Sequence, residues 1–100
     1  MKTDRELLEL AAKAAGYEAD FTKPYEIKVD RDWHKWNPLE DDGDNRRLQV
    51  KLFLALIPCE SGGWDAVRYD SESYEEIMVV SDVDPKRAIV RAAAAIGESL

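Results

Sequence analysis

Residues 36–52 read WNPLEDDGDNRRLQVKL, and every other element of the chain has to pack around this central stretch. Pro38 ends an incoming strand, because proline has no backbone N–H to donate to a sheet ladder. The acids that follow complement the positive end of a helix dipole, and one of them can accept hydrogen bonds from the free amides of the first turn. The stretch therefore predicts a strand end followed directly by a helix start.

The apolar residues after this helix start fit two kinds of secondary structure. Leu48, Leu52 and Leu56 recur at helical spacing, whereas the alternate residues from 48 to 56 fit a strand. The acidic entry and the basic side chains that follow it favour a helix. We predict a helix over residues 42–54, with Ala55 to Pro58 leaving it as an extended segment.

The same acids allow a second hypothesis, a divalent-cation site at Asp41, Asp42 and Asp44. A calcium loop needs alternating oxygen ligands and a bidentate glutamate at its twelfth position. Here the acids are contiguous, and the twelfth residue counted from Asp41 is Leu52. Helix capping is therefore the preferred interpretation. We predict no metal and no cofactor, and keep Mg²⁺ or Ca²⁺ binding by these acids as an alternative.

A first hairpin is predicted before the central stretch. Residues 25–29 alternate apolar and charged side chains, which is typical of a half-buried strand, and 33–36 can return antiparallel to them. Trp33 and Trp36 lie three positions apart, so we expect one ring to be partly exposed or a bulge to intervene. Residues 17–23 are expected to connect this hairpin to the preceding element, with room for a short strand at their start.

A second hairpin and a last helix are predicted after the central stretch. Residues 64–69 and 74–80 are rich in strand formers and are separated by a polar turn. Asp84 and Pro85 are a helix start, with Asp at the cap and Pro at the first helical position. We expect Gly97 to close this helix.

The first helix is predicted from both of its ends. Thr3 and Glu6 fit a reciprocal capping box, in which each side chain accepts from the other residue's backbone amide. Gly16 suits the left-handed position that commonly ends a helix. We predict a helix over residues 4–15.

The predicted order α-β-β-α-β-β-α indicates an α+β fold in a single domain over residues 1–100. Two hairpins favour a four-stranded, mainly antiparallel sheet. Three amphipathic helices need apolar surface to cover, so we expect them to pack with the sheet in layers.

The composition is that of a globular protein, with 45% hydrophobic and 35% charged residues among 100. One cysteine, Cys59, and one histidine, His34, exclude an internal disulfide and a zinc site of the usual Cys/His type. No apolar run approaches the ~20 residues that a membrane span needs, and the opening residues carry no apolar signal segment. We therefore predict a cytoplasmic protein without membrane contact.

The negative charge is concentrated in one segment. Residues 60–84 hold eight acids and one basic residue, Arg68, which accounts for the whole formal net charge of −7. Such a field repels phosphate backbones, so we predict no direct nucleic-acid binding. The segment is either a solvated face or a surface for a basic partner. The candidate partner-binding residues are Asp65, Asp70, Glu72, Glu75 and Glu76.

Three blocks of the sequence carry a family resemblance. They are residues 6–17, the motifs WNPL at 36–39 and DDGD at 41–44 with Leu48 and Lys51-Leu52 after them, and residues 85–97. Together they cover about half the chain and resemble small phage and prophage proteins of the phage ABA-sandwich domain family, while the strands between them match poorly. The resemblance implies a phage origin and a layered α/β architecture. It brings no activity to any residue.

No residue set amounts to a catalytic signature. His34 has no evident nucleophile partner, and Cys59 precedes an acid, whereas a reactive thiolate needs positive surroundings. We favour a non-enzymatic, phage-derived accessory protein that binds a host protein, with inhibition of a host defence complex as the expected outcome. The alternative is a small carboxylate-based metal- or ligand-binding protein or enzyme. An exposed Trp33 or Trp36 beside Tyr25 would make a homodimer patch.

Overall fold

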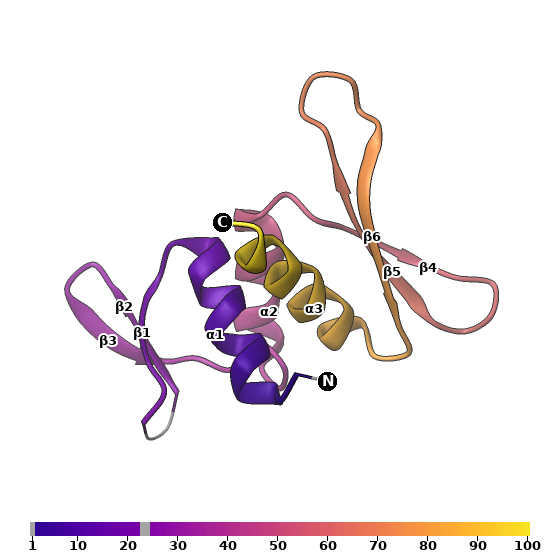
Figure 1. The fold of residues 1–100 in the computed structure, drawn as a ribbon. Coiled ribbons are helices and arrows are strands. Elements are labelled where there is room, and N and C mark those ends of the chain that lie inside the picture. The colour runs from indigo at the N-terminus through magenta and orange to yellow at the C-terminus, as the bar shows by residue number, and fades with distance from the viewer. Residues whose placement is uncertain (1, 23–24) are drawn as a thin grey trace.

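The computed structural model describes residues 2–22 and 25–100, and in them three helices lie between two three-stranded antiparallel sheets (Figure 1). The helices are α1 (Asp4–Ala15), α2 (Asp42–Lys51) and α3 (Pro85–Glu98). The first sheet contains β1 (Glu18–Asp20), β2 (Glu26–Val29) and β3 (Asp32–Lys35). The second sheet contains β4 (Ala55–Pro58), β5 (Trp64–Tyr69) and β6 (Glu76–Asp82).

The α+β class is confirmed, but the prediction of one four-stranded sheet is wrong. Each predicted hairpin forms its own sheet, on opposite sides of the helices (Figure 1). Each hairpin also gains a short third strand, because Ala19 pairs with Ile27 and Ala55 pairs with Val67. Strand β1 is the short strand for which the connector 17–23 left room, and β4 is the predicted extended segment Ala55 to Pro58. Their pairing with the hairpins was not predicted, because strands of three or four residues show too little alternation to indicate a partner. Of the predicted connector 17–23, Lys23 lies outside the described residues.

The predicted helix caps are confirmed at three ends. Glu6 N donates to Thr3 Oγ1 at 3.1 Å, and Thr3 N donates to Glu6 Oε1 at 3.2 Å. Gly16 ends α1 with φ 74°, and Asp84 caps α3 with Pro85 in its first turn.

None of the helices in the described part of the chain is long and apolar enough to cross a membrane.

Helix α2 begins where the acids predict and ends three residues early. Asp41 is its N-cap, and Asp44 N donates to Asp41 Oδ2 at 2.8 Å. The helix ends at Lys51 because Phe53 adopts the left-handed conformation, with φ 54°, and Leu54 N turns back to Gln49 O at 3.0 Å. The left-handed residue that ends a helix is usually glycine. Here it is Phe53, so the sequence gives no signal that the helix ends.

The prediction that Gly97 closes the last helix is wrong, because α3 continues to Glu98. Gly97 is buried and lies against the backbone of α1, where a Cβ would be 2.8 Å from the carbonyl carbon of Leu10. The glycine is therefore a close-approach site between two helices. Around it the helices bury small side chains such as Ala11, Ala92 and Ala93.

Strand β6 begins two residues later than predicted. Residues 71–73 form a turn, and Tyr74 has φ 58°, which takes the chain out of the extended conformation. Asp70 N donates to Glu75 O at 2.8 Å and closes the hairpin below this turn. The strand then runs to Asp82, which lengthens the free edge of the second sheet.

Candidate functional site

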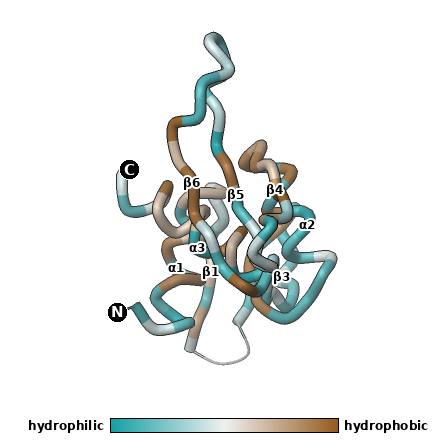
Figure 2. The backbone as a smooth tube through the Cα atoms, turned by 90° about the vertical axis from the view of Figure 1, so that its right-hand side faces the viewer, coloured by the Kyte–Doolittle hydropathy of each residue, from teal (hydrophilic) through white to brown (hydrophobic). Residues whose placement is uncertain are grey.

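The β5–β6 hairpin extends beyond the helical body and carries all five predicted partner-binding residues (Figure 1). Residues 69–85 contain no Lys, Arg or His. Figure 2 shows the hairpin changing from hydrophilic at its tip to hydrophobic where it joins the body. The structure thus presents a negatively charged projection on an apolar base.

Among the described residues, Glu72, Glu75 and Glu76 are the unpaired carboxylates of this projection. All three side chains are exposed, and none forms an ion pair within residues 2–22 and 25–100. They follow one another around the tip and into β6, so their fields add. We call these three residues the acidic tip.

Asp70, also predicted as a partner-binding residue, builds the turn instead. Its carboxylate accepts hydrogen bonds from Glu72 N at 2.9 Å and Ser73 N at 3.0 Å. These backbone donors hold the pKa of Asp70 below its ordinary value of 3.8. Asp70 therefore stays ionised and orders the acidic tip.

Asp65, the fifth predicted residue, lies at the other end of the hairpin. Its carboxylate accepts a hydrogen bond from Ser81 Oγ at 2.5 Å, and this bond lowers its pKa, as does a second one from Cys59. The same contact raises the pKa of the Cys59 thiol, which disfavours the reactive thiolate. The structure does not bring Asp65 together with the acidic tip.

An apolar sheet face that sequence reasoning missed lies beside the acidic tip. Ala55, Val67 and Val79 are opposite one another across the three strands, on the side that does not face α3. Val67, in the middle strand, is 2% exposed, although it does not pack into the main hydrophobic core. Val79, in the edge strand, is 47% exposed. We call this surface the outer face; its exposed apolar residues are Phe53, Ile57, Tyr69, Ile77 and Val79.

A hollow of about 630 Å³ joins the outer face to the hairpin tip. Phe53, Tyr69, Tyr74 and Ile77 line it with aromatic and aliphatic surface, and Asp70 and Arg68 add one charge of each sign. Phe53 and Tyr74 are 88% and 79% exposed. The alternation of apolar residues at 53, 55 and 57 is the signal that could have predicted this surface, but the preferred helix over 42–54 obscured it.

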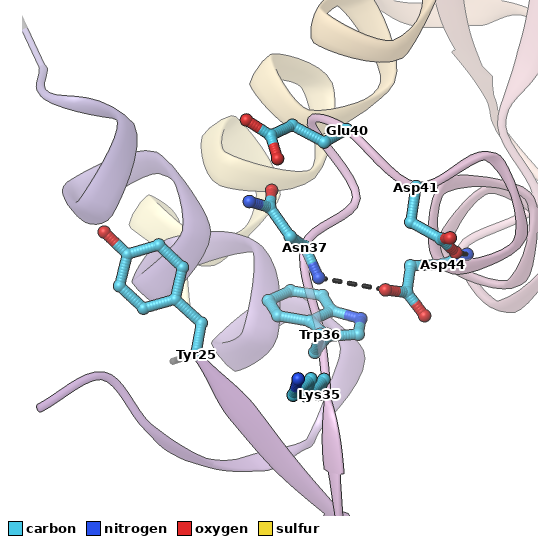
Figure 3. A pocket seen from close by; sticks show the side chains of 7 residues that line it. All are labelled: Tyr25, Lys35, Trp36, Asn37, Glu40, Asp41 and Asp44. Atoms are coloured by element: carbon cyan, nitrogen blue, oxygen red, sulfur yellow. Dashed lines mark hydrogen bonds between the residues drawn. The ribbon is translucent and has the colours of Figure 1, made fainter. Parts of the chain in front are cut away.

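The acids of the central stretch border a second cleft, of about 770 Å³, beside Trp36 (Figure 3). The three carboxylates of the candidate cation site already have protein partners, whereas Glu40, which also lines the cleft, has no side-chain hydrogen bond or ion pair within the described residues. Asp41 caps α2, Asp42 pairs with Lys86 Nζ at 2.8 Å, and Asp44 accepts from Asn37 N at 2.9 Å and Arg47 Nη2 at 2.8 Å. No group of three His, Cys, Asp or Glu side chains in the described residues is arranged to hold a metal ion.

The two tryptophans of the predicted dimer patch occupy different environments. Trp36 is 3% exposed and packs its ring against Tyr17 and Phe21, so it cannot contribute to a surface. Trp33 is 44% exposed, opposite Lys28 on the first sheet. The expectation that one ring would be partly exposed is confirmed, and the homodimer stays a prediction.

Comparison with family models, with curated protein sequences and with solved structures gives no match to this chain. The resemblance to the phage ABA-sandwich domain family is therefore carried by the sequence blocks alone. The candidate site is accordingly defined by its own geometry: an acidic tip, an ordered turn beneath it and an exposed apolar face.

Proposed function

We propose that this chain is a non-enzymatic binding protein of phage origin that attaches to a basic surface of a host protein in the bacterial cytoplasm. Inhibition of a host defence complex is the activity that fits this role. The observation that supports the proposal is the β5–β6 hairpin, where three free glutamates stand beside exposed apolar side chains. Charge complementarity of this kind speeds encounter and selects partners, while the apolar surface supplies contact area.

The rest of the molecule supports binding over catalysis. Three carboxylates that line the two clefts, Asp41, Asp44 and Asp70, are held in structural hydrogen bonds. The Cys59 thiol has a raised pKa, which disfavours a nucleophilic role. The acidic tip projects from the helical body, which suits contact with another protein.

The experiment immobilises the chain and exposes it to host lysate at low salt and at about 0.5 M salt, where exposed charges are screened. Three baits are compared: the wild type, Glu75→Gln/Glu76→Gln in the acidic tip, and Glu18→Gln/Glu40→Gln, which removes two exposed charges elsewhere. The proposal expects a basic host protein on the first and third baits, lost from the second and released by salt. Equal retention by all three baits, or no retained protein, would refute it.

A further inference from the structure

Strand β6 is an open edge of the second sheet. In the described residues it pairs with β5 on one side only, over the segment EIMVVSD. An edge strand presents unpaired backbone N–H and C=O groups, and proteins often protect such edges with lysine or proline. Strand β6 contains neither, and its charges are confined to its ends; its one irregularity is a register shift against β5 between Arg68 and Tyr69.

The hydrogen-bond pattern shows which backbone groups of β6 point outward. Cys59 N donates to Gly63 O at 2.8 Å, so the odd-numbered residues of β5 direct their backbone groups toward β4 and the even-numbered ones toward β6. Pro58 and Trp64 then form a non-hydrogen-bonded pair of the ladder, where the missing N–H of proline has no effect. From Met78 to Asp82 the even residues of β6 consequently bond to β5, and Val79 and Ser81 point outward. The register shifts at Tyr69, which pairs with Glu76, and Glu75 O accepts from Asp70 N, so beyond Ile77 it is Glu76 that points outward.

The far end of this edge is already occupied. Arg91 Nη1 donates to Ser81 O at 2.8 Å and lies 3.1 Å from Asp82 Oδ2, so it satisfies the outward carbonyl and neutralises the acid beside it. The outward groups that remain are the N–H and C=O of Glu76 and Val79 and the N–H of Ser81. The free edge therefore runs from Glu76 to Val80.

The charges beside the free edge specify its occupant. Glu75 and Glu76 lie at its start with no basic residue near them in the sequence, whereas Asp82 at its end is paired. A strand laid along the edge meets negative charge at one end and the apolar side chains of Ile77 and Val79 along its length. A second copy of this chain would bring the same glutamates and a further formal charge of −7 to the contact.

We propose that the edge of β6 from Glu76 to Val80 binds an extended peptide segment of a protein partner by strand addition, with Lys or Arg at the end of the segment beside Glu75 and Glu76. This inference rests on the proposed function and gives its binding mode. Backbone hydrogen bonds to Glu76 and Val79 hold the added strand, and its alternate apolar side chains extend the outer face.

The test uses a fluorescent seven-residue peptide of alternating Val and Thr with two Lys at one end, titrated with the full chain and followed by anisotropy. Two further peptides carry N-methyl groups on alternate residues, one on each edge of the strand. Only the edge that faces β6 should be sensitive, so one N-methylated peptide should bind at least about tenfold more weakly and the other nearly as well as the parent. Equal effects of the two patterns would overturn strand addition.

Charge variants test the predicted orientation. Glu75→Gln/Glu76→Gln should weaken peptide binding about fivefold, Glu18→Gln/Glu40→Gln should not, and added salt should weaken it. Sedimentation that shows a dimer growing with salt would make a second copy the occupant and overturn the proposal. A lysate partner that depends on the acidic tip, without peptide binding, overturns strand addition and leaves the proposed function standing. Loss of both overturns both.

Discussion

Replacing Gly97 with alanine tests how closely α1 and α3 pack. Gly97 lies inside α3 and against Leu10 of α1, where an added Cβ would be 2.8 Å from the Leu10 carbonyl carbon and 3.2 Å from its Cα. The obstacle is helix backbone, which cannot rotate away as a side chain can. A carbon needs about 3.5 Å to its neighbours, so the two helices would have to separate by roughly 1 Å.

Two opposing terms set the expected change in stability. Alanine is favoured over glycine in a helix interior by about 1 kcal/mol, and less in a last turn. Overpacking of a tight contact costs about 1–3 kcal/mol or more, and here it also loosens fully buried neighbours such as Leu8 and Ile89. We expect Gly97→Ala to lose about 2 kcal/mol, which lowers the Tm of a domain of this size by about 10 °C.

The assay is thermal and urea unfolding followed by circular dichroism, with Gly43→Ala as the matched control. Gly43 lies in the first turn of α2, and a Cβ there meets only the ends of the Arg47 and Asp41 side chains, at 3.1 to 3.2 Å. The control should be neutral or gain up to about 0.5 kcal/mol from helix propensity. A Gly97→Ala protein as stable as the wild type would refute the close backbone approach of the two helices.

Three further predictions concern carboxylates. Asp41→Ala removes the acceptor for Asp44 N and should cost about 1 kcal/mol in urea unfolding, whereas unchanged stability would argue against capping by Asp41. Asp65→Asn should speed the reaction of Cys59 with a thiol reagent at about pH 8, because the hydrogen bond to Asp65 raises the thiol pKa; an equal rate would contradict that cause. The depressed pKa of Asp70 stabilises the fold above its unfolded value of 3.8, and this contribution disappears as pH falls through the folded pKa. Denaturation between about pH 5 and pH 2.5 should therefore show a larger loss for the wild type than for Asp70→Asn.

Local chemistry made the helix starts predictable. Thr3 with Glu6, Asp41, and Asp84 with Pro85 satisfy free amides within three residues of themselves, so the sequence pattern contains the whole interaction. The two helix glycines show where this information stops. Gly16 has φ 74° and no atom within 4 Å of an added Cβ, whereas Gly97 is helical and touches α1. A glycine that ends a helix and a glycine that lets two helices approach look alike in the sequence. Only the contact of Gly97 with α1, a segment distant in the chain, distinguishes them.

The division into two sheets was beyond the sequence for a related reason. Both hairpins have the alternation of half-buried strands, and nothing local states whether their edges join. The buried Asn45 shows what keeps them apart: its side-chain amide donates to Pro38 O at 2.8 Å and Lys86 O at 3.0 Å, which fixes α2 between the hairpins and against α3. Of the candidate site, the acids were predictable from composition. The structural roles of Asp65 and Asp70 and the outer face depended on strand register.

This arrangement separates the surface proposed for binding from the packing that holds the fold together. The acidic tip lies beyond the ordered turn of Asp70, and its glutamates contribute no ion pair or buried surface within the described residues. Glu75→Gln/Glu76→Gln should therefore leave the Tm within about 2 °C of the wild type, since surface changes of this kind rarely exceed ~0.5 kcal/mol. A partner lost on this substitution, with the unfolding transition unchanged, can then be assigned to the contact itself, because the helices and both sheets remain as they were.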